Sequence, residues 1–169
     1  AELELKMINI YDKNGIKVNR PIRKSKLKEG QVDLGSYKHF MQKEIFEQPQ
    51  AIRDTLESRI TKDNVVISSF AYNSKEIFEK IKQVQIIACG TSYNAGLVAK
   101  YWLEDIAKIP CNVEVASEYR YRHPIILDRT LFVTISQSGE TADTLEALKT
   151  AKKINKKIKT LCISNSAES

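Results

Sequence analysis

The stretch IIACGTSYNAG, residues 86–96, decides the fold of this chain. It contains the end of an apolar run, residues 84–88, which has the length of a buried strand and stops at Gly90. Apolar residues then recur at spacings of three and four, the period of a helix with one buried face. This helical stripe consists of Ala95, Val98, Trp102 and Ile106. A strand followed directly by a helix is the repeating unit of α/β proteins.

Three more strand-like runs follow, at residues 112–116, 131–135 and 158–163. An amphipathic helical pattern separates the last two, carried by Leu145, Leu148, Ala151 and Ile154. Apolar strands that alternate with helices indicate a parallel sheet covered on both faces. We therefore expect an α/β fold in three layers with a flavodoxin-like sheet. In the common flavodoxin-like order 2-1-3-4-5, the first and third strands are neighbours.

The first sixty residues have a different pattern. Polar and apolar residues alternate over residues 3–11, as in a half-buried strand, and Asn14-Gly15 favours a tight turn, so residues 3–20 are interpreted as a β-hairpin. Residues 20–39 are predicted to be a linker. A helix is expected from Phe40, interrupted at Pro49 and followed by a second helix over residues 50–60. The small hairpin and a last strand with no following helix predict that the sequence is an internal piece of a longer polypeptide.

Composition excludes several classes of protein. The chain has 169 residues, of which 42% are hydrophobic and 28% charged, as in an ordinary globular protein. No apolar run approaches the roughly 18 residues of a membrane helix, and acidic and basic residues interrupt any signal peptide at the start. The densest basic run lacks interleaved aromatic residues, so we expect no nucleic-acid partner. That run consists of Arg20, Arg23, Lys24, Lys26 and Lys28.

The three cysteines indicate a reducing compartment, and we expect a cytoplasmic protein. Cys89, Cys111 and Cys162 are odd in number and show no CxxC spacing, so neither a disulfide framework nor a metal site is predicted. All three lie in or beside apolar runs and are interpreted as small buried hydrophobic residues. No cofactor is expected.

Two loops carry the chemistry of the sequence. Residues 89–94 follow the first strand of the sheet, and residues 136–141 follow the third. Each places glycine and hydroxyl residues where a helix begins, and a helix start presents unpaired N–H groups to an anion. Neither loop has the lysine of a nucleotide-binding P-loop or a GxGxxG pattern. If the strands that carry them are neighbours, the two loops flank one crevice and bind one anion.

A structural alternative stays open for individual hydroxyls. Ser138 and Ser92 are at positions where an N-cap alone would account for them. Glu140 adds negative charge at the helix start, which stabilises the helix but opposes an anion, so we expect its carboxylate to turn away from the ligand.

At this point the two loops resemble a known family. IIACGTSYNAG (86–96) and TISQSGETADT (134–144) are similar to the two phosphosugar loops of sugar isomerase (SIS) domains. YKHFMQKEIFEQP (37–49) and ASEYRYR (116–122) resemble the glutamine–fructose-6-phosphate aminotransferase family, in which SIS domains follow a glutaminase domain. The resemblance implies that residues 1–35 are the tail of a glutaminase domain and a linker, residues 36–73 a connecting segment with the first isomerase helices, and residues 74–169 a truncated first SIS domain.

The resemblance also implies a reaction and its partners. Such enzymes make glucosamine 6-phosphate and glutamate from fructose 6-phosphate and glutamine, and SIS domains usually pair, so a homodimer is expected. The residues implied to hold the sugar phosphate are Thr91, Ser92, Ser136, Gln137, Ser138 and Thr141. The catalytic groups of the family have no counterpart in this chain, and its local candidates for proton transfer are Glu118 and His123. We therefore assign no catalytic residue and predict that the chain alone is inactive.

Two other functions share this fold. A SIS-type module could sense a phosphosugar in a regulator, but such a regulator would carry a helix-turn-helix segment where this sequence predicts a hairpin. A related deglycase or isomerase would lack the glutaminase domain, and residues 1–49 argue against it.

Overall fold

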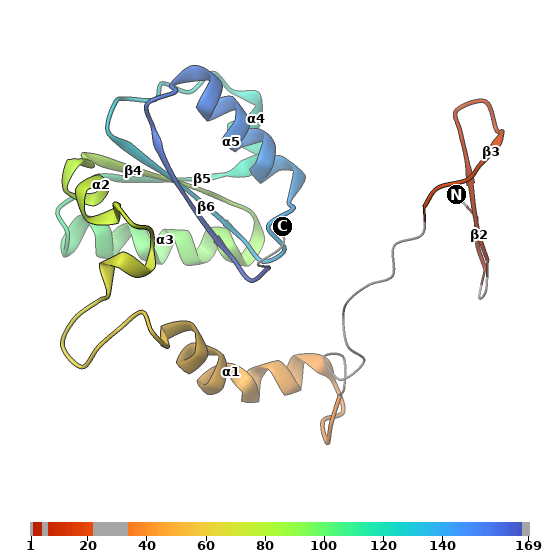
Figure 1. The fold of residues 1–169 in the computed structure, drawn as a ribbon, viewed down its shortest axis with the longest axis horizontal. Coiled ribbons are helices and arrows are strands. Elements are labelled where there is room, and N and C mark those ends of the chain that lie inside the picture. The colour runs from red at the N-terminus through yellow and green to blue at the C-terminus, as the bar shows by residue number, and fades with distance from the viewer. Residues whose placement is uncertain (1, 5–6, 22–33, 167–169) are drawn as a thin grey trace. The chain divides into compact units, whose positions relative to one another are not determined.

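The computed structural model describes residues 2–4, 7–21 and 34–166 (Figure 1). The chain divides into two compact units, residues 1–57 and residues 58–169. Most of the predicted linker and of the basic run lies outside the described residues.

A small antiparallel sheet opens the first unit. Its strands are β1 (Glu2–Glu4), β2 (Met7–Tyr11) and β3 (Lys17–Val18), in the order β1-β2-β3. The prediction of one strand over residues 3–11 was wrong, because β1 pairs with β2 in the register Glu4↔Met7 and the chain reverses between them. Alternation alone cannot reveal such a reversal when the residues on either side keep the same period.

The predicted turn at Asn14-Gly15 is confirmed. Gly15 has φ +78°, and its N–H donates to the carbonyl oxygen of Asp12 at 3.1 Å. The Asp12 carboxylate accepts the N–H groups of Asn14 and Ile16 at 2.8 and 2.9 Å. The Asp12 side chain and the positive φ of Gly15 together close the β2–β3 hairpin.

Helix α1 (Phe40–Leu56) is continuous through Pro49, so the predicted interruption was wrong. A proline removes one backbone hydrogen bond, but i,i+4 contacts on both sides support this helix. They include the ion pair Lys43–Glu47 at 3.6 Å and the hydrogen bond from Gln50 to Asp54 at 2.6 Å. The helix also ends four residues before the predicted end at Ile60, and none of its described residues is buried within the structure.

The second unit contains the predicted parallel sheet (Figure 1). Its strands are β4 (Gln83–Ala88), β5 (Cys111–Val115), β6 (Thr130–Ser136) and β7 (Lys159–Ser164), in the order β5-β4-β6-β7. Every neighbouring pair is parallel. In chain order this is 2-1-3-4, which confirms the flavodoxin-like expectation. The helical elements are η2 (Ile67–Ser69), α2 (Ser74–Lys80), α3 (Gly90–Asp105), α4 (Ala116–Tyr121) and α5 (Ala142–Ile154).

Helices cover both faces of the sheet, as Figure 1 shows. On one face α4 and α5 enclose a buried cluster around Ile87, Tyr119 and Phe132. On the other face α3 packs through Ala99 and Leu103 against Ile86 and other aliphatic strand residues. The middle strands β4 and β6 therefore lie inside the core, where they hold the loops that follow them.

The predicted face of α3 was the wrong one. Trp102 is 63% exposed and Ile106 76%, and Ala95 and Val98 are exposed as well. The helix instead approaches the sheet through Gly96, where an added Cβ would lie 3.0 Å from Cγ1 of Val113. A residue without a side chain lets the helix backbone come close to the strands, and period counting passes over such a contact because it scores large apolar residues.

Two other burial expectations need correction. Cys162 is exposed, whereas Cys111 is buried and Cys89 is intermediate. Cys162 lies on β7, an edge strand, so its side chain has a paired strand on one side only. On α5 the buried residues are Thr144, Ala147 and Ala151, while Leu145 and Ile154 of the predicted stripe are exposed.

Among the described residues, no helix combines the length and the apolar character needed to span a bilayer.

Candidate anion-binding site

The two hydroxyl-rich loops leave the sheet from adjacent strands. β4 and β6 are paired in parallel with the register Ala88↔Ile135, so residue 89 and residue 136 begin their loops side by side. Neighbouring strands lie about 4.8 Å apart. Because both loops start at the carboxyl ends of these neighbouring strands, they lie on either side of one position at that end of the sheet, as the sequence predicts.

The first loop turns directly into α3. Gly90 has φ +56°, a conformation that glycine adopts without strain, and it starts the helix one residue after Cys89. Thr91 is exposed and Ser92 is half-buried in the first turn. Cys89, the N-cap residue, makes no side-chain hydrogen bond to the helix. The first N–H groups of α3 therefore have no cap from that side chain.

The second loop is closed by its own hydroxyl groups. Oγ of Ser136 lies 2.9 Å from Oγ1 of Thr141, and it accepts the N–H of Gly139 at 3.1 Å. Oγ of Ser138 accepts the N–H of Glu140 at 3.2 Å. Ser136 is buried, whereas Gln137 and Ser138 are exposed. The result is a compact turn that leaves the side chains of Gln137 and Ser138 exposed to solvent.

Helix capping does not explain the presence of Ser92 and Ser138 in these loops. The N-cap of α5 is Thr141 rather than Ser138, and the Thr141 side chain makes no cap hydrogen bond because it contacts Ser136 instead. Ser92 lies inside α3 and not at its N-cap. Both helix starts lack side-chain caps and follow loops from neighbouring strands, so each provides N–H donors and the positive end of a helix dipole. This arrangement suits an anion.

The carbonyl oxygen of Gln137 anchors the second loop to the segment after β7. It accepts the N–H of Asn165 at 3.2 Å. This contact fixes the backbone of Gln137 and leaves its side chain exposed at the surface of the loop.

Sequence reasoning assigned no role to Arg120, which contacts the site through Asp143. Nη1 of Arg120 on α4 lies 2.8 Å from Oδ1 of Asp143, in the first turn of α5. A sequence signal was present, since Arg120 belongs to the ASEYRYR segment, but nothing in that segment indicates a partner 23 residues away. The two candidates for proton transfer, Glu118 and His123, are both exposed.

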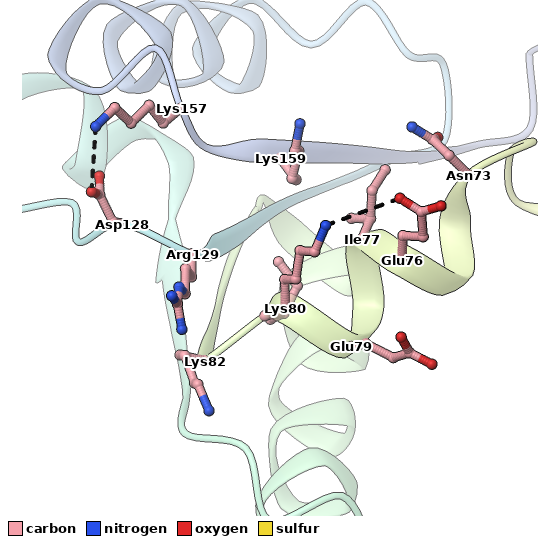
Figure 2. Close-up of a pocket in the computed structure, with 11 residues that line it drawn as sticks. Asn73, Glu76, Ile77, Glu79, Lys80, Lys82, Asp128, Arg129, Lys157 and Lys159 are labelled. Atoms are coloured by element: carbon pink, nitrogen blue, oxygen red, sulfur yellow. Dashed lines mark ion pairs between the residues drawn. The ribbon is translucent and has the colours of Figure 1, made fainter.

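A hollow of about 590 Å³ lies at the opposite end of the sheet, where the strands begin (Figure 2). Basic residues line it, but acidic side chains offset part of their charge. Lys80 pairs with Glu76 at 4.0 Å, and Lys157 pairs with Asp128 at 3.8 Å. Lys80 also stands at the carboxyl end of α2, where a cation complements the helix dipole. This hollow therefore has an adequate structural explanation.

Comparison with protein families gives a match to the SIS domain over residues 77–169. Among curated proteins, the chain is 52% identical to glutamine–fructose-6-phosphate aminotransferase [isomerizing] of Vibrio vulnificus, over 90% of this chain and 25% of that protein. The homologue of Shewanella oneidensis is 50% identical over 98% of this chain and 27% of that protein. The chain thus spans about a quarter of the length of the curated relatives it matches.

Two solved structures have folds similar to that of this chain. The C-terminal domain of glucosamine-fructose-6-phosphate aminotransferase from Francisella tularensis matches with a TM-score of 0.76 and 50% identity, covering 82% of this chain and 38% of that one. Glucosamine-6-phosphate deaminase from Thermotoga maritima matches with a TM-score of 0.56 and 29% identity, covering 76% and 35%.

Proposed function

Because this chain belongs to the SIS domain family, we propose that its two adjacent loops bind the phosphate group of a sugar phosphate. One observation carries the proposal. The loops after β4 and β6 leave neighbouring parallel strands and lead into two helices without side-chain N-caps. A phosphate placed there receives N–H donors from both helix starts and hydroxyl donors from both loops.

The proposed ligands are the six residues that the sequence singled out. Thr91 and Ser92 contribute from the first turn of α3, and Ser138 and Gln137 from the exposed part of the second loop. Ser136 and Thr141 act together, since their hydroxyls already share a hydrogen bond and hold the loop closed. A dianionic phosphate takes several such donors at once, because each of its oxygens accepts more than one hydrogen bond.

We further propose that the chain is part of a transferase that uses glutamine to convert fructose 6-phosphate into glucosamine 6-phosphate, with glutamate as the second product. The names of the relatives support this assignment. In this proposal residues 1–35 belong to the glutaminase domain and its linker, residues 36–73 connect the domains, and residues 74–169 form the phosphate-binding half of the isomerase. No catalytic residue is assigned within the chain.

Pairing of SIS domains is part of the same proposal. The stripe of α3 formed by Val98, Trp102 and Ile106 is exposed and apolar. Apolar surface of this kind favours contact with another domain, and a second SIS domain in a homodimer is the partner we propose for it.

The direct test is a nuclear magnetic resonance titration of the 169-residue chain with fructose 6-phosphate. Inorganic phosphate and unphosphorylated fructose serve as comparison ligands. We expect amide signals of residues 90–94 and 136–144 to shift with fructose 6-phosphate and with phosphate, and to stay unchanged with fructose. Shifts confined to other parts of the chain would contradict the proposed site.

A further inference from the structure

A short helix, α4, packs against both the sheet and helix α5. Its residues Ala116 and Tyr119 are buried against the sheet, and the Tyr119 ring meets that of Phe132 edge to face at 5.6 Å. With these two residues fixed in the core, the helix presents Arg120 toward α5, where the guanidinium donates to Asp143.

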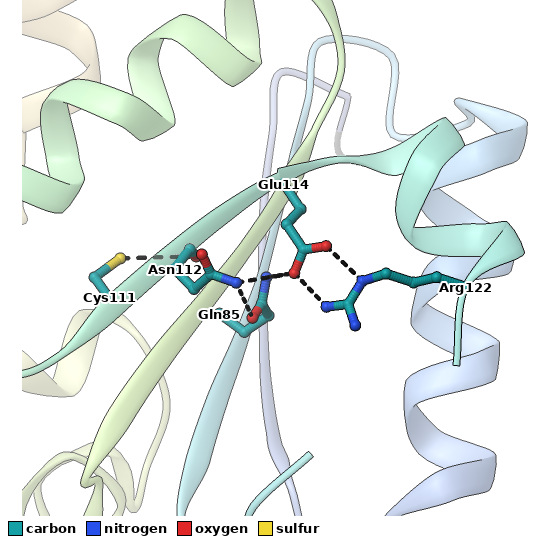
Figure 3. A network of polar contacts seen from close by, with 5 residues as sticks. All are labelled: Gln85, Cys111, Asn112, Glu114 and Arg122. Carbon is teal, nitrogen blue, oxygen red and sulfur yellow. Dashed lines mark hydrogen bonds and ion pairs between the residues drawn. The ribbon is translucent and has the colours of Figure 1, made fainter. Parts of the chain in front are cut away.

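A second arginine, Arg122, follows Arg120 at the carboxyl end of α4 and contacts the neighbouring strand β5, as Figure 3 shows. Nε and Nη2 of Arg122 donate to the two carboxylate oxygens of Glu114 on β5, at 2.7 and 2.5 Å. Glu114 also accepts hydrogen bonds from Gln85 and Asn112. The Arg122 guanidinium covers the Tyr119 ring at 5.1 Å from its centroid. A two-point arginine–carboxylate contact restricts orientation as well as distance, so the carboxyl end of α4, which carries Arg120, is fixed against the sheet.

The partner of Arg120 occupies a sensitive position. Asp143 is the second residue of α5 and lies in the first turn, whose N–H groups we propose bind phosphate. Its side chain is only 35% exposed, so water screens its charge less than that of the exposed Glu140. A lone carboxylate there would offset the positive end of the helix dipole and repel a phosphate.

We propose that Arg120 is a positioning residue that cancels the charge of Asp143 and so keeps the start of α5 attractive to the phosphate group; this inference rests on the proposed function. Asp143 still stabilises the first turn of the helix, and the Arg120 charge offsets the repulsion between the Asp143 carboxylate and the phosphate. The guanidinium also lies over the Tyr121 ring, 5.2 Å from its centroid.

The test compares four variants of the chain in the fructose 6-phosphate titration. Arg120→Gln leaves Asp143 unneutralised and should weaken binding about fivefold, the size of a charge effect at a helix end. Arg120→Lys keeps the positive charge and should bind within about twofold of the original chain. Asp143→Asn alone should bind at least as tightly as the original chain. The double variant Arg120→Gln/Asp143→Asn should recover the original affinity.

Lys157→Gln provides the matched control. It removes the same charge from the ion pair with Asp128 at the opposite edge of the sheet and should leave affinity unchanged. Thermal unfolding of each variant shows whether any loss of affinity follows a loss of structure.

The outcomes separate the inference from the proposed function. If the original chain shows no phosphate-dependent shifts at the loops, the proposed function itself fails. If the chain binds but Arg120→Gln binds equally well, the inference is overturned. A double variant that stays as weak as Arg120→Gln would also overturn it, because Arg120 would then act on the ligand or the backbone directly.

Discussion

The side chains of Ser136 and Thr141 meet at 2.9 Å between their hydroxyl oxygens, although the two residues are five positions apart along the chain. Ser136 ends a buried strand and Thr141 begins a helix. Their contact closes the turn between β6 and α5, and the N–H of Gly139 within the turn donates to the same Ser136 hydroxyl. The shape of the proposed phosphate site therefore depends on hydroxyl groups that have two tasks, to hold the loop and to bind the ligand.

Replacing both serines of the second loop should weaken ligand binding. Ser136→Ala/Ser138→Ala removes two hydroxyls, and each charge-assisted hydrogen bond contributes roughly 1.5–3 kcal/mol. We expect affinity for fructose 6-phosphate to fall at least about tenfold. Calorimetry or the resonance titration measures it, with Ser69→Ala as control, because the Ser69 hydroxyl donates to the Val66 carbonyl oxygen within its own turn. Equal affinity in the double variant and the control would show that the second loop is not part of the binding site.

Tyr119→Phe should stabilise the chain. The Tyr119 hydroxyl is buried and has no hydrogen-bond partner among the described residues, and burial raises its pKa to about 12. Removing an unsatisfied buried hydroxyl recovers about 1 kcal/mol, or about 2–4 °C in the unfolding midpoint. Tyr121→Phe is the control, since Tyr121 is exposed and should change nothing. A clear loss of stability in Tyr119→Phe would show that the hydroxyl has a partner.

Gly96→Val should destabilise the sheet–helix packing. A Cβ at this position already lies 3.0 Å from Val113 and 3.1 Å from Ile86, so two further methyl groups have no room. Overpacking of this kind costs about 1–3 kcal/mol. Ala95→Val on the exposed side of α3 places the same branched side chain in the helix without the crowding. Denaturant unfolding compares the two, and equal losses would mean that close approach at Gly96 is unimportant.

The cysteines should differ in reactivity toward iodoacetamide. Burial raises the pKa of the Cys111 thiol to about 11, whereas Cys162 is exposed. At pH 8 only on the order of one Cys111 in a thousand is then a thiolate, the reactive form. Mass spectrometry should find Cys162 modified first and Cys111 only after unfolding. Labelling of both at similar rates in the folded chain would contradict the buried environment of Cys111.

The sequence predicted the parallel sheet and its strand order correctly because long-range constraints reinforce local ones there. Apolar strands that alternate with helices allow few arrangements, and right-handed crossovers remove most of those. That order predicts that the loops beginning at Gly90 and Ser136 leave the sheet from neighbouring strands. The identity of the ligand residues stays a prediction that the proposed titration tests.

The errors have a shared physical cause. At Pro49, on α3 and along residues 3–11, the sequence pattern was interpreted locally while neighbouring contacts decided the outcome. Helix α1 continues through Pro49 because one lost backbone bond is a limited cost. Helix α3 turns Gly96 inward because a small residue permits close packing, which a count of large apolar residues ignores. The Arg120–Asp143 pair was missed for the same reason, since two residues on separate helices leave no local pattern.

Strand β4 is hydrogen-bonded to a neighbour along both of its edges. Its amide hydrogens should therefore be among the slowest in the chain to exchange with deuterium, since they are released only when the sheet itself opens. The Cys89–Gly90 turn is rooted in this protected strand. We therefore expect the Cys89–Gly90 turn to keep its geometry when a ligand binds, even if the outer parts of the loops move.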